Sequence, residues 1–270
     1  MPEGHTLHRL ARELTTAFAG EPVVSSSPQG RFTAAARLDG RPFAAASALG
    51  KHLFVGFDGL AEQVHVHLGL YGSFLLSSEP DPPVVGQVRW RLSNREVCAD
   101  LRGPTACELI TPDEVAAIAG RLGPDPLVPG ADPAVALRRI TASRRPVAAL
   151  LMDQQVLAGV GNVYRAEVLF RQRVDPMRPG CDLRPVTFMR MWADLVDLMG
   201  TGVMTGRIDT VRPEHEPEAM GRPPRQDDHG GEVYVYRRAG ERCFVCGAVV
   251  RSAVLESRNL FWCPRCQRRG

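Results

Sequence analysis

The sequence predicts an α+β protein with more than one domain: a strand-rich N-terminal part, a helical part and a small metal-binding module. Three observations predict it. Hydrophobic residues alternate with polar ones between residues 21 and 110, recur at three- and four-residue spacing after residue 134, and are followed by two Cys-x2-Cys pairs. With 270 residues and 44% hydrophobic content, the chain can build cores for two ordinary domains.

The composition narrows the class of protein. No apolar stretch approaches the roughly 18 residues that a membrane span needs, and the first 20 residues lack the pattern of a secretory signal, so we expect a cytoplasmic protein. The net charge is +3, but residues 237–270 hold eight arginines against two glutamates, which leaves about −3 for the rest. This basic block can neutralise phosphates, although an ordinary solvated surface is the alternative.

Residues 5–19 read as an amphipathic helix, because their apolar side chains recur on one face: Leu7, Leu10, Ala11, Leu14 and Phe18. The helix starts beside Pro2 and Glu3. The positive end of its dipole therefore favours an anionic group at these two residues.

Two hairpins predict an all-β domain with few helices. The first has alternating apolar residues on both sides of an Asp58-Gly59 turn: Leu53, Val55 and Phe57 before it, and Val64, Val66 and Leu68 after it. The second shows the same alternation over residues 88–92 and 97–101, on both sides of Asn94-Arg95. We place this domain at residues 1–119.

Residues 120–134 contain four prolines and three glycines, which predicts a linker. Helical spacing follows in four segments, at residues 134–141, 146–157, 162–171 and 187–200. Residues 205–231 are poor in apolar periodicity and read as a long, mobile loop, while residues 232–237 alternate again. We therefore expect a helical domain over 135–231 and a metal-binding module over 232–270.

The four cysteines predict one structural zinc ion. Cys243, Cys246, Cys263 and Cys266 have the spacing of a four-thiolate zinc ribbon or finger. Two disulfides are the alternative, which the absence of secretion signals disfavours. Four thiolates leave no open position for catalysis, so the ion would instead hold rigid a loop that carries Arg251 and Arg258, whose guanidinium groups suit phosphate contact. The remaining cysteines, Cys98, Cys107 and Cys181, are expected to be buried thiols.

Two further patterns are weaker. Gly159-Val160-Gly161-Asn162 lies between predicted helices, where backbone N–H groups and the Asn162 amide could approach a phosphate, although a plain interhelical turn is the commoner explanation. His65 and His67 alternate along one strand and, without a third ligand nearby, are more typical of a polar strand face than of a metal site.

The N-terminal residues Pro2 and Glu3 have a specific chemical interpretation. A small second residue allows removal of Met1, which leaves the secondary amine of Pro2 with a pKa near 8. Such an amine can form an iminium with an aldehyde-level carbon such as C1′ of deoxyribose, and Glu3 can shuttle protons beside it. Lys51, the only lysine among 33 basic residues, differs from arginine as a compact donor that can lose its proton.

Together these motifs resemble the formamidopyrimidine-DNA glycosylase and endonuclease VIII family. Pro2-Glu3, Lys51, the glycine-rich turn and the four-cysteine finger occur in the family's order along nearly the whole chain, with Arg258 five residues before Cys263. Residues 150–180 resemble the family's helix-two-turn-helix module. The resemblance implies an N-terminal β-sandwich with flanking helices, a helical domain with a zinc finger, and damaged DNA as partner.

The resemblance also implies roles for single residues. Pro2 would attack C1′, Glu3 would protonate the sugar or the leaving base, and β- and δ-elimination would follow without a nucleotide cofactor. Lys51 and Arg258 would bind flanking phosphates and assist elimination, and Asn162 would hold the backbone. Leu70 and Tyr71 would fill the gap that the everted base leaves in the stack. Glu167 would lie near the pocket that receives the base.

The start Pro2-Glu3-Gly4-His5-Thr6 and the Leu70-Tyr71-Gly72 turn favour the endonuclease VIII branch, and hence oxidised pyrimidines as substrates. Some members carry glutamine where this chain has Gly69, so a contact from that position to the orphaned base is lost. Oxidised purines are the main alternative substrates. A different kind of function is also possible for such a sequence: a DNA-binding protein without catalytic activity. We expect a monomer associated with the nucleoid and not with a membrane.

Overall fold

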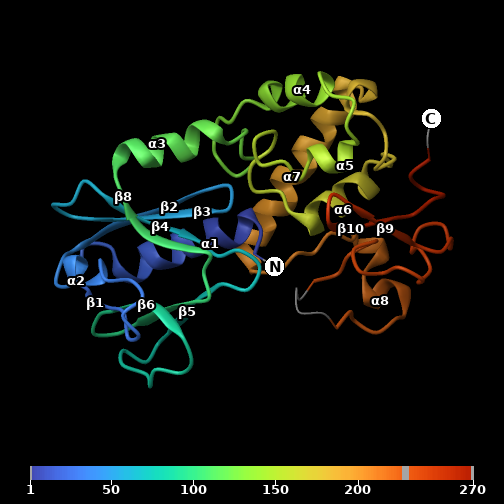
Figure 1. The fold of residues 1–270 in the computed structure, drawn as a ribbon. Helices are drawn as coiled ribbons and strands as arrows, with labels where there is room; N and C mark the ends of the chain where they lie inside the picture. The colour runs from blue at the N-terminus through green and yellow to red at the C-terminus, as the bar shows by residue number, and fades with distance from the viewer. Residues whose placement is uncertain (1, 227–230, 269–270) are drawn as a thin grey trace. The chain divides into compact units, whose positions relative to one another are not determined.

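The computed structural model describes residues 2–226 and 231–268, which divide into two compact units, residues 1–121 and 122–270 (Figure 1). This division lies inside the predicted linker. Each unit has its own hydrophobic core. Among the described residues, no helix is both long enough and apolar enough to cross a membrane.

The N-terminal unit is a β-sandwich flanked by helices. One antiparallel sheet has the order β1-β6-β7-β5 and the other the order β2-β3-β4-β8. The strands are β1 Val24–Ser26, β2 Phe43–Leu49, β3 His52–Phe57, β4 Gln63–His67, β5 Ser73–Ser77, β6 Val88–Ser93, β7 Cys98–Arg102 and β8 Ala106–Ile110. Both predicted hairpins are confirmed, as β3–β4 and β6–β7.

Side chains from both sheets share one core, in which Val55 and Val64 of one sheet and Trp90 and Leu101 of the other are fully buried. Helix α1 (Gly4–Phe18) adds its apolar face to this core, as predicted for residues 5–19. Two further helices, α2 (Ala35–Leu38) and α3 (Pro112–Arg121), complete the unit.

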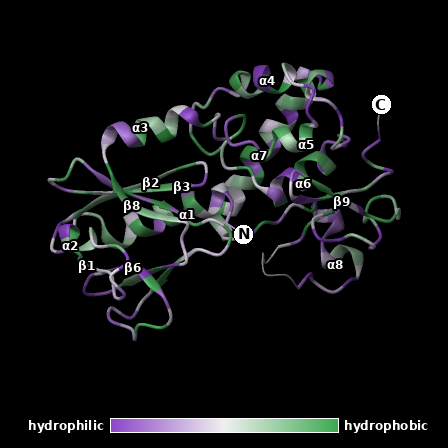
Figure 2. Cartoon of the chain, viewed as in Figure 1, coloured by the Kyte–Doolittle hydropathy of each residue, from purple (hydrophilic) through white to green (hydrophobic). Residues whose placement is uncertain are grey.

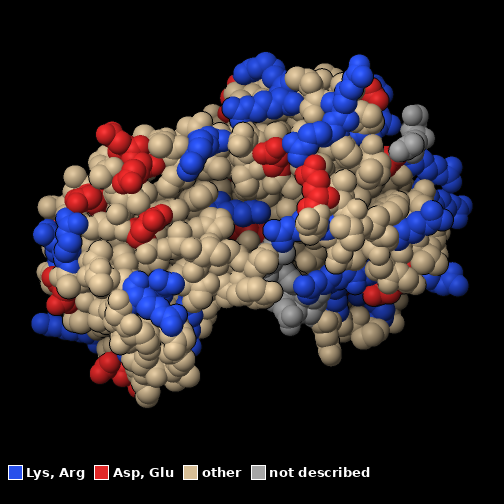
Figure 3. Space-filling model, viewed as in Figure 1, with Lys and Arg blue, Asp and Glu red and all other residues tan. Residues whose placement is uncertain are grey.

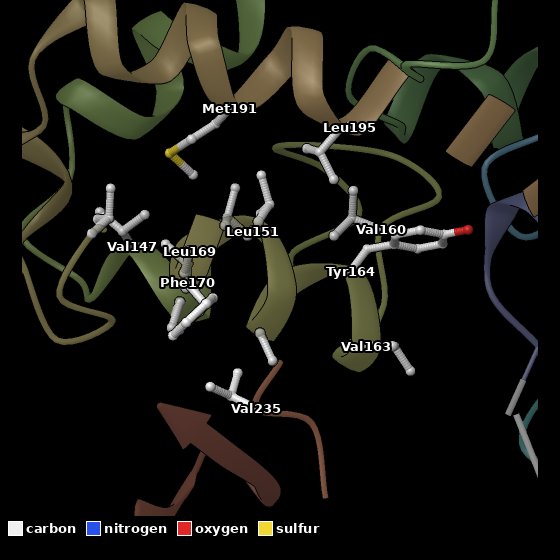
Figure 4. Packing of buried hydrophobic residues seen from close by; sticks show 14 of the residues in the cluster. Val147, Leu151, Val160, Val163, Tyr164, Leu169, Phe170, Met191, Leu195 and Val235 are labelled. Atoms are coloured by element: carbon white, nitrogen blue, oxygen red, sulfur yellow. The ribbon is translucent and has the colours of Figure 1, made fainter. Parts of the chain in front are cut away.

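The C-terminal unit is helical and ends in a β-hairpin. Its helices are α4 Pro133–Thr141, α5 Val147–Leu150, α6 Asn162–Arg171, α7 Pro185–Thr205 and α8 Pro217–Met220, and its strands are β9 Arg251–Leu255 and β10 Arg258–Trp262. Figure 2 shows hydrophobic residues along the inner helices of this unit. In Figure 4, Met191 and Leu195 of α7 face Leu151, which follows α5, and Leu169 of α6.

Two expectations for this unit are wrong, that of the helix over 146–157 and that of a buried Cys181. The helix expected over 146–157 ends at Leu150, because residues 151–158 turn back, with Gly159 N–H donating to the Gln154 side chain at 3.0 Å. Residues 232–237 form no strand despite their alternation. Cys181 is exposed, whereas Cys98 is buried and Cys107 half-buried.

The described part of the predicted mobile loop is held by contacts. Its residues 213–215 form a 3-10 turn and residues 217–220 form α8. Arg212 N–H donates to the Tyr234 hydroxyl at 2.9 Å, and Arg222 pairs with Glu232 at 2.7 Å. Residues 227–230 of the predicted loop lie outside the described residues.

Candidate functional site

Pro2 and Glu3 lie at the start of helix α1. Glu3 is the N-cap residue, with extended backbone angles, and its carbonyl accepts a hydrogen bond from Thr6 N–H at 2.9 Å. The Glu3 side chain is fully buried, whereas Pro2 is half-buried. A carboxylate at this end of the helix lies in the positive field of the dipole, as expected. Met1, whose removal would expose the Pro2 amine, lies outside the described residues.

Lys51 lies in a turn between two strands. It occupies the tight turn between β2 and β3, where Gly50 has φ of +59°. The ammonium is close enough to His67 to help lower the pKa of that imidazole, although burial of His67 is the larger cause. The register of β3 with β4, which sets Leu53 opposite Val66, places Lys51 at the end of the sheet from which residues 68–72 emerge.

Three histidines share one face of the β2-β3-β4-β8 sheet. His52 Nδ1 lies 2.8 Å from His65 Nε2, and His65 Nδ1 lies 3.0 Å from the Glu108 carboxylate. Because the carboxylate only accepts, His65 Nδ1 donates to Glu108, and a second hydrogen bond joins His65 Nε2 to His52 Nδ1. Burial, with the neighbouring His65, His67 and Arg121, lowers the pKa of His52 to about 4. These groups form a polar strand face, as expected for His65 and His67.

The turn between β4 and β5, residues 68–72, carries Leu70 and Tyr71. Gly72 N–H donates to Leu68 carbonyl at 3.0 Å, which closes the turn. Leu70 is 42% exposed and Tyr71 is 91% exposed, although both are large apolar side chains. Side chains of this kind in solvent indicate a contact surface.

Asn162 is the first residue of α6 and connects the glycine-rich turn to the terminal hairpin. Its amide donates to the Asn259 carbonyl at 3.0 Å, and its Oδ1 accepts from Arg165. Arg165 is fully buried and also donates to the Asn259 carbonyl, at 3.1 Å. Asn259 follows Arg258, so the structure brings Asn162 and Arg258 to the same part of the C-terminal unit.

The tip of the hairpin β9–β10 is fixed in position. Glu256 and Ser257 adopt positive φ angles of 47° and 61°, and Arg145 donates to both Glu256 oxygens at 3.0 Å. Arg258 follows at the start of β10, half-buried, and none of the described residues supplies an acceptor for its guanidinium. Sequence reasoning missed Arg145 and Arg165, because nothing in their local pattern distinguishes them from other arginines.

The four predicted cysteine ligands are brought together. Cys243, Cys246, Cys263 and Cys266 place their sulfur atoms within 4.8 Å of one another, with 3.9 Å between Cys243 and Cys266 and 3.4 Å between Cys246 and Cys263. In a tetrahedron with Zn–S bonds of about 2.3 Å the sulfurs lie roughly 3.8 Å apart, so the site fits zinc. Burial raises the pKa of Cys243 to about 11 and also raises that of Cys266, which a bound cation would reverse.

Glu167 does not face an open pocket. It is fully buried in the middle of α6, where it accepts hydrogen bonds from Thr210 Oγ1 at 2.6 Å and from three consecutive backbone N–H groups at 2.7, 2.9 and 2.8 Å, those of Tyr234, Val235 and Tyr236. These bonds explain why residues 232–237 form no strand: their N–H groups turn inward to a carboxylate. In this structure Glu167 holds the segment that leads into the hairpin.

Comparison with known proteins places these features in one family. Family models match residues 1–107 (formamidopyrimidine-DNA glycosylase N-terminal domain), 122–212 (formamidopyrimidine-DNA glycosylase H2TH domain) and 240–269 (zinc finger found in FPG and IleRS). Proteins named Endonuclease 8 1 from Mycobacterium bovis and Mycobacterium tuberculosis are 56% identical, over 99% of this chain and 100% of theirs. A formamidopyrimidine-DNA glycosylase from Parasynechococcus marenigrum is 31% identical, over 82% of this chain and 80% of its own.

Solved structures show the same fold. The Lactococcus lactis Fpg in complex with DNA containing an abasic site has a TM-score of 0.79 at 19% identity, over 99% of this chain and 100% of that one. The same enzyme with DNA containing an oxidised pyrimidine has a TM-score of 0.77 at 19% identity, with the same coverage. The chain therefore belongs to the formamidopyrimidine-DNA glycosylase and endonuclease VIII family.

Proposed function

We propose that this chain is a bifunctional DNA glycosylase and AP lyase that removes oxidised bases, pyrimidines in preference to purines. The observation that carries the proposal is the pair Pro2 and buried Glu3 at the start of α1, in a member of this family. The 56% identity to proteins named Endonuclease 8 1 supports the pyrimidine branch. The partner is damaged DNA, in agreement with the DNA complexes of its structural relatives.

The proposed reaction begins at the Pro2 amine after Met1 is removed. The nitrogen lone pair attacks C1′ of the damaged nucleotide, the glycosidic bond breaks, and the base leaves with the bonding electrons and with the proton that the Pro2 nitrogen gives up. Glu3 protonates O4′ as the sugar ring opens, which produces an iminium between C1′ and Pro2. Glu3 follows Pro2 directly in the chain, and its buried side chain belongs to the N-cap residue of α1, where the helix dipole favours negative charge.

The iminium then acts as an electron sink for strand cleavage. Loss of a C2′ proton expels the 3′ phosphate by β-elimination, and a second proton loss expels the 5′ phosphate by δ-elimination. Water hydrolyses the iminium and restores the Pro2 amine. We propose that Lys51 and Arg258 bind the flanking phosphates and assist these steps, that Asn162 holds the backbone, and that Leu70 and Tyr71 enter the vacated stack.

We propose that the four cysteines bind one zinc ion, which supplies rigidity to the hairpin that carries Arg258. All four ligand positions are thiolates, so the site has no place for a substrate. Inductively coupled plasma mass spectrometry should give one zinc per chain, and about none for Cys246→Ser.

Sodium borohydride trapping tests the enzyme directly. With DNA that contains an abasic site, we expect a covalent complex, with mass spectrometry placing the reduced adduct on Pro2. The same chain with Met1 retained, in which the Pro2 nitrogen is part of a peptide bond, is the matched control and should give no adduct on Pro2. If Met1-processed protein neither traps nor cleaves the abasic strand, the chain is a DNA-binding protein without this chemistry.

Substrate preference is tested with duplexes that contain thymine glycol, dihydrouracil or 8-oxoguanine. Faster release of both pyrimidines is the expected result, and faster release of 8-oxoguanine would assign the chain to the oxidised-purine branch instead. We further propose that the protein acts as a monomer without a nucleotide cofactor, associated with the nucleoid in the cytoplasm, and that its domains follow the boundaries predicted from the sequence.

A further inference from the structure

The β4–β5 turn presents its two exposed apolar side chains before any DNA is bound. Leu70 and Tyr71 lie at 42% and 91% exposure, so neither is held by burial in the core. A side chain that must enter a base stack binds better when its backbone already has the required shape, because less conformational freedom is then lost. The contacts that hold residues 68–72 in this shape therefore contribute to the proposed insertion of Leu70 and Tyr71 into DNA.

One threonine outside the turn supplies these contacts. Thr105 lies just before β8, which pairs with β4 in a register that sets His67 opposite Ala106. Its backbone N–H donates to the His67 carbonyl at 2.8 Å, and its hydroxyl donates to the same carbonyl at 3.0 Å. The hydroxyl oxygen in turn accepts from His67 Nδ1 at 2.8 Å. Both the backbone and the side chain of His67 are thus attached to Thr105, immediately before the turn begins.

The methyl group of Thr105 restricts the turn by its volume. Gly69 has φ of +68°, and a Cβ placed there would overlap the Thr105 Cγ2 atom. A Cβ on Gly72 would overlap the Leu68 carbonyl. The space that a side chain at position 69 would occupy is therefore filled by Thr105, from another part of the chain.

We propose that Thr105 is a positioning residue for insertion of Leu70 and Tyr71 into DNA, acting through its hydroxyl on His67 and through its methyl group on Gly69. This inference rests on the proposed function. It also explains the absence of a side chain at position 69: Thr105 and Gly69 form a complementary pair, in which a larger residue at 69 requires a smaller one at 105.

Two substitutions separate the hydroxyl from the methyl group. Thr105→Val keeps the shape and removes the hydroxyl, whereas Thr105→Ser keeps the hydroxyl and removes the methyl group. Each variant is assayed in single turnover on a lesion in duplex DNA and on the same lesion in a single strand, where no stack has to be opened. We expect Thr105→Val to lower the ratio of duplex to single-strand rate at least tenfold.

Thr111→Val is the matched control. This substitution also removes a threonine hydroxyl from the N-terminal unit. Thr111 lies before α3, and its hydroxyl donates to Glu114 Oε2 at 2.9 Å. Thr111→Val should lower thermal stability without changing the ratio of the duplex rate to the single-strand rate. If Thr105→Val lowers both rates equally, or neither, Thr105 only stabilises the β4–β8 ladder and the proposal is overturned.

A double-substitution experiment tests the complementary pair. Gly69→Ala should lower the duplex rate at least tenfold, and Gly69→Ala combined with Thr105→Ser should recover at least threefold of that loss. The strain of a positive φ is common to both proteins, so the recovery measures the overlap with the methyl group alone. Absence of recovery contradicts the pairing, whereas wild-type protein that is inactive on every substrate contradicts the proposed function and not this inference alone.

Discussion

The two units of this chain divide the charge unevenly. Residues 1–121 contain 11 basic and 13 acidic residues, whereas residues 122–270 contain 22 basic and 17 acidic ones. On the face shown in Figure 3, basic side chains are spread over the C-terminal unit. The unit that contains Pro2 and Glu3 is thus slightly acidic, whereas the unit that contains Asn162 and Arg258 carries a net positive charge, which attracts anions such as phosphates.

The units also use buried polar groups differently. In the N-terminal unit, Glu3 is buried at a helix start, and His52, His65 and Glu108 are joined by hydrogen bonds. In the C-terminal unit, Glu167 and Arg165 are buried to fix the position of the hairpin. The comparison indicates that changes in the first unit alter reaction steps or pH dependence, while changes in the second alter stability or affinity.

The largest effect is expected for Glu3→Gln. Loss of the acid should slow base release by about 10²–10⁴-fold, because an amide cannot donate the proton that opens the sugar ring. The affinity for lesion DNA should stay within about threefold, since phosphate contacts are unchanged. Single-turnover kinetics and a binding titration separate the two quantities. Glu13→Gln, on the same helix and paired with Arg9, is the control; an equal loss in both variants would refute the special role of Glu3.

Glu167→Gln should destabilise the C-terminal unit by about 2–4 kcal/mol, since the amide presents a donor where buried backbone N–H groups need an acceptor. Urea unfolding measures the change in the free energy of unfolding. Glu218→Gln, at an exposed position on α8, should change it by less than about 0.5 kcal/mol. A stability close to wild type in Glu167→Gln, with loss of activity on duplex lesions, would instead return this residue to the base pocket.

Acidification should weaken the N-terminal unit through His52. The folded-state pKa of about 4 lies below the ordinary 6.5, so the unfolded chain binds more protons between these values. The stabilisation is complete above pH 6.5 and is lost as the pH falls toward 4, by about 2 kcal/mol after allowance for partial exposure. His52→Phe should flatten the pH dependence of the free energy of unfolding over this interval. An unchanged slope would show that the ring is protonated in the folded protein.

Arg258→Ala should have the smallest of these effects, a loss of roughly 1–2 kcal/mol in DNA affinity that is uniform across sequences. The slope of log K against log salt should fall by about 1, because one phosphate contact is lost. Fluorescence anisotropy at several salt concentrations measures both. Arg190→Ala, at an exposed position on α7, is the control, and an equal change in slope would show that Arg258 contributes only general charge.

Elements with a strong local pattern could be predicted from the sequence. Helix α1 and both hairpins follow from spacing, and the four cysteine ligands follow from theirs. The conformation of residues 232–237 could not, because the backbone N–H groups of Tyr234, Val235 and Tyr236 donate to Glu167, which lies 67 to 69 residues earlier in the chain. Burial of long-range partners overrides local periodicity in such a segment.

The candidate site was predicted only where chemistry marks a residue. Pro2, Glu3 and Lys51 are unusual in type or position, so they could be proposed from the sequence alone. Thr105 and Arg165 carry no such signal, since threonine before a strand and arginine in a helix are common. Their importance depends on what lies across the fold: the His67 carbonyl for one and the Asn259 carbonyl for the other.

The Glu167 carboxylate has a consequence for the order of folding. Its three backbone partners lie 67 to 69 residues further along the chain, so the bonds close a long loop at a considerable cost in chain entropy. Helix α6 is local and can form early, whereas residues 234–236 can dock only after it presents the carboxylate. We therefore expect the hairpin module to reach its final position late, with α6 serving as the template on which the end of the chain is assembled.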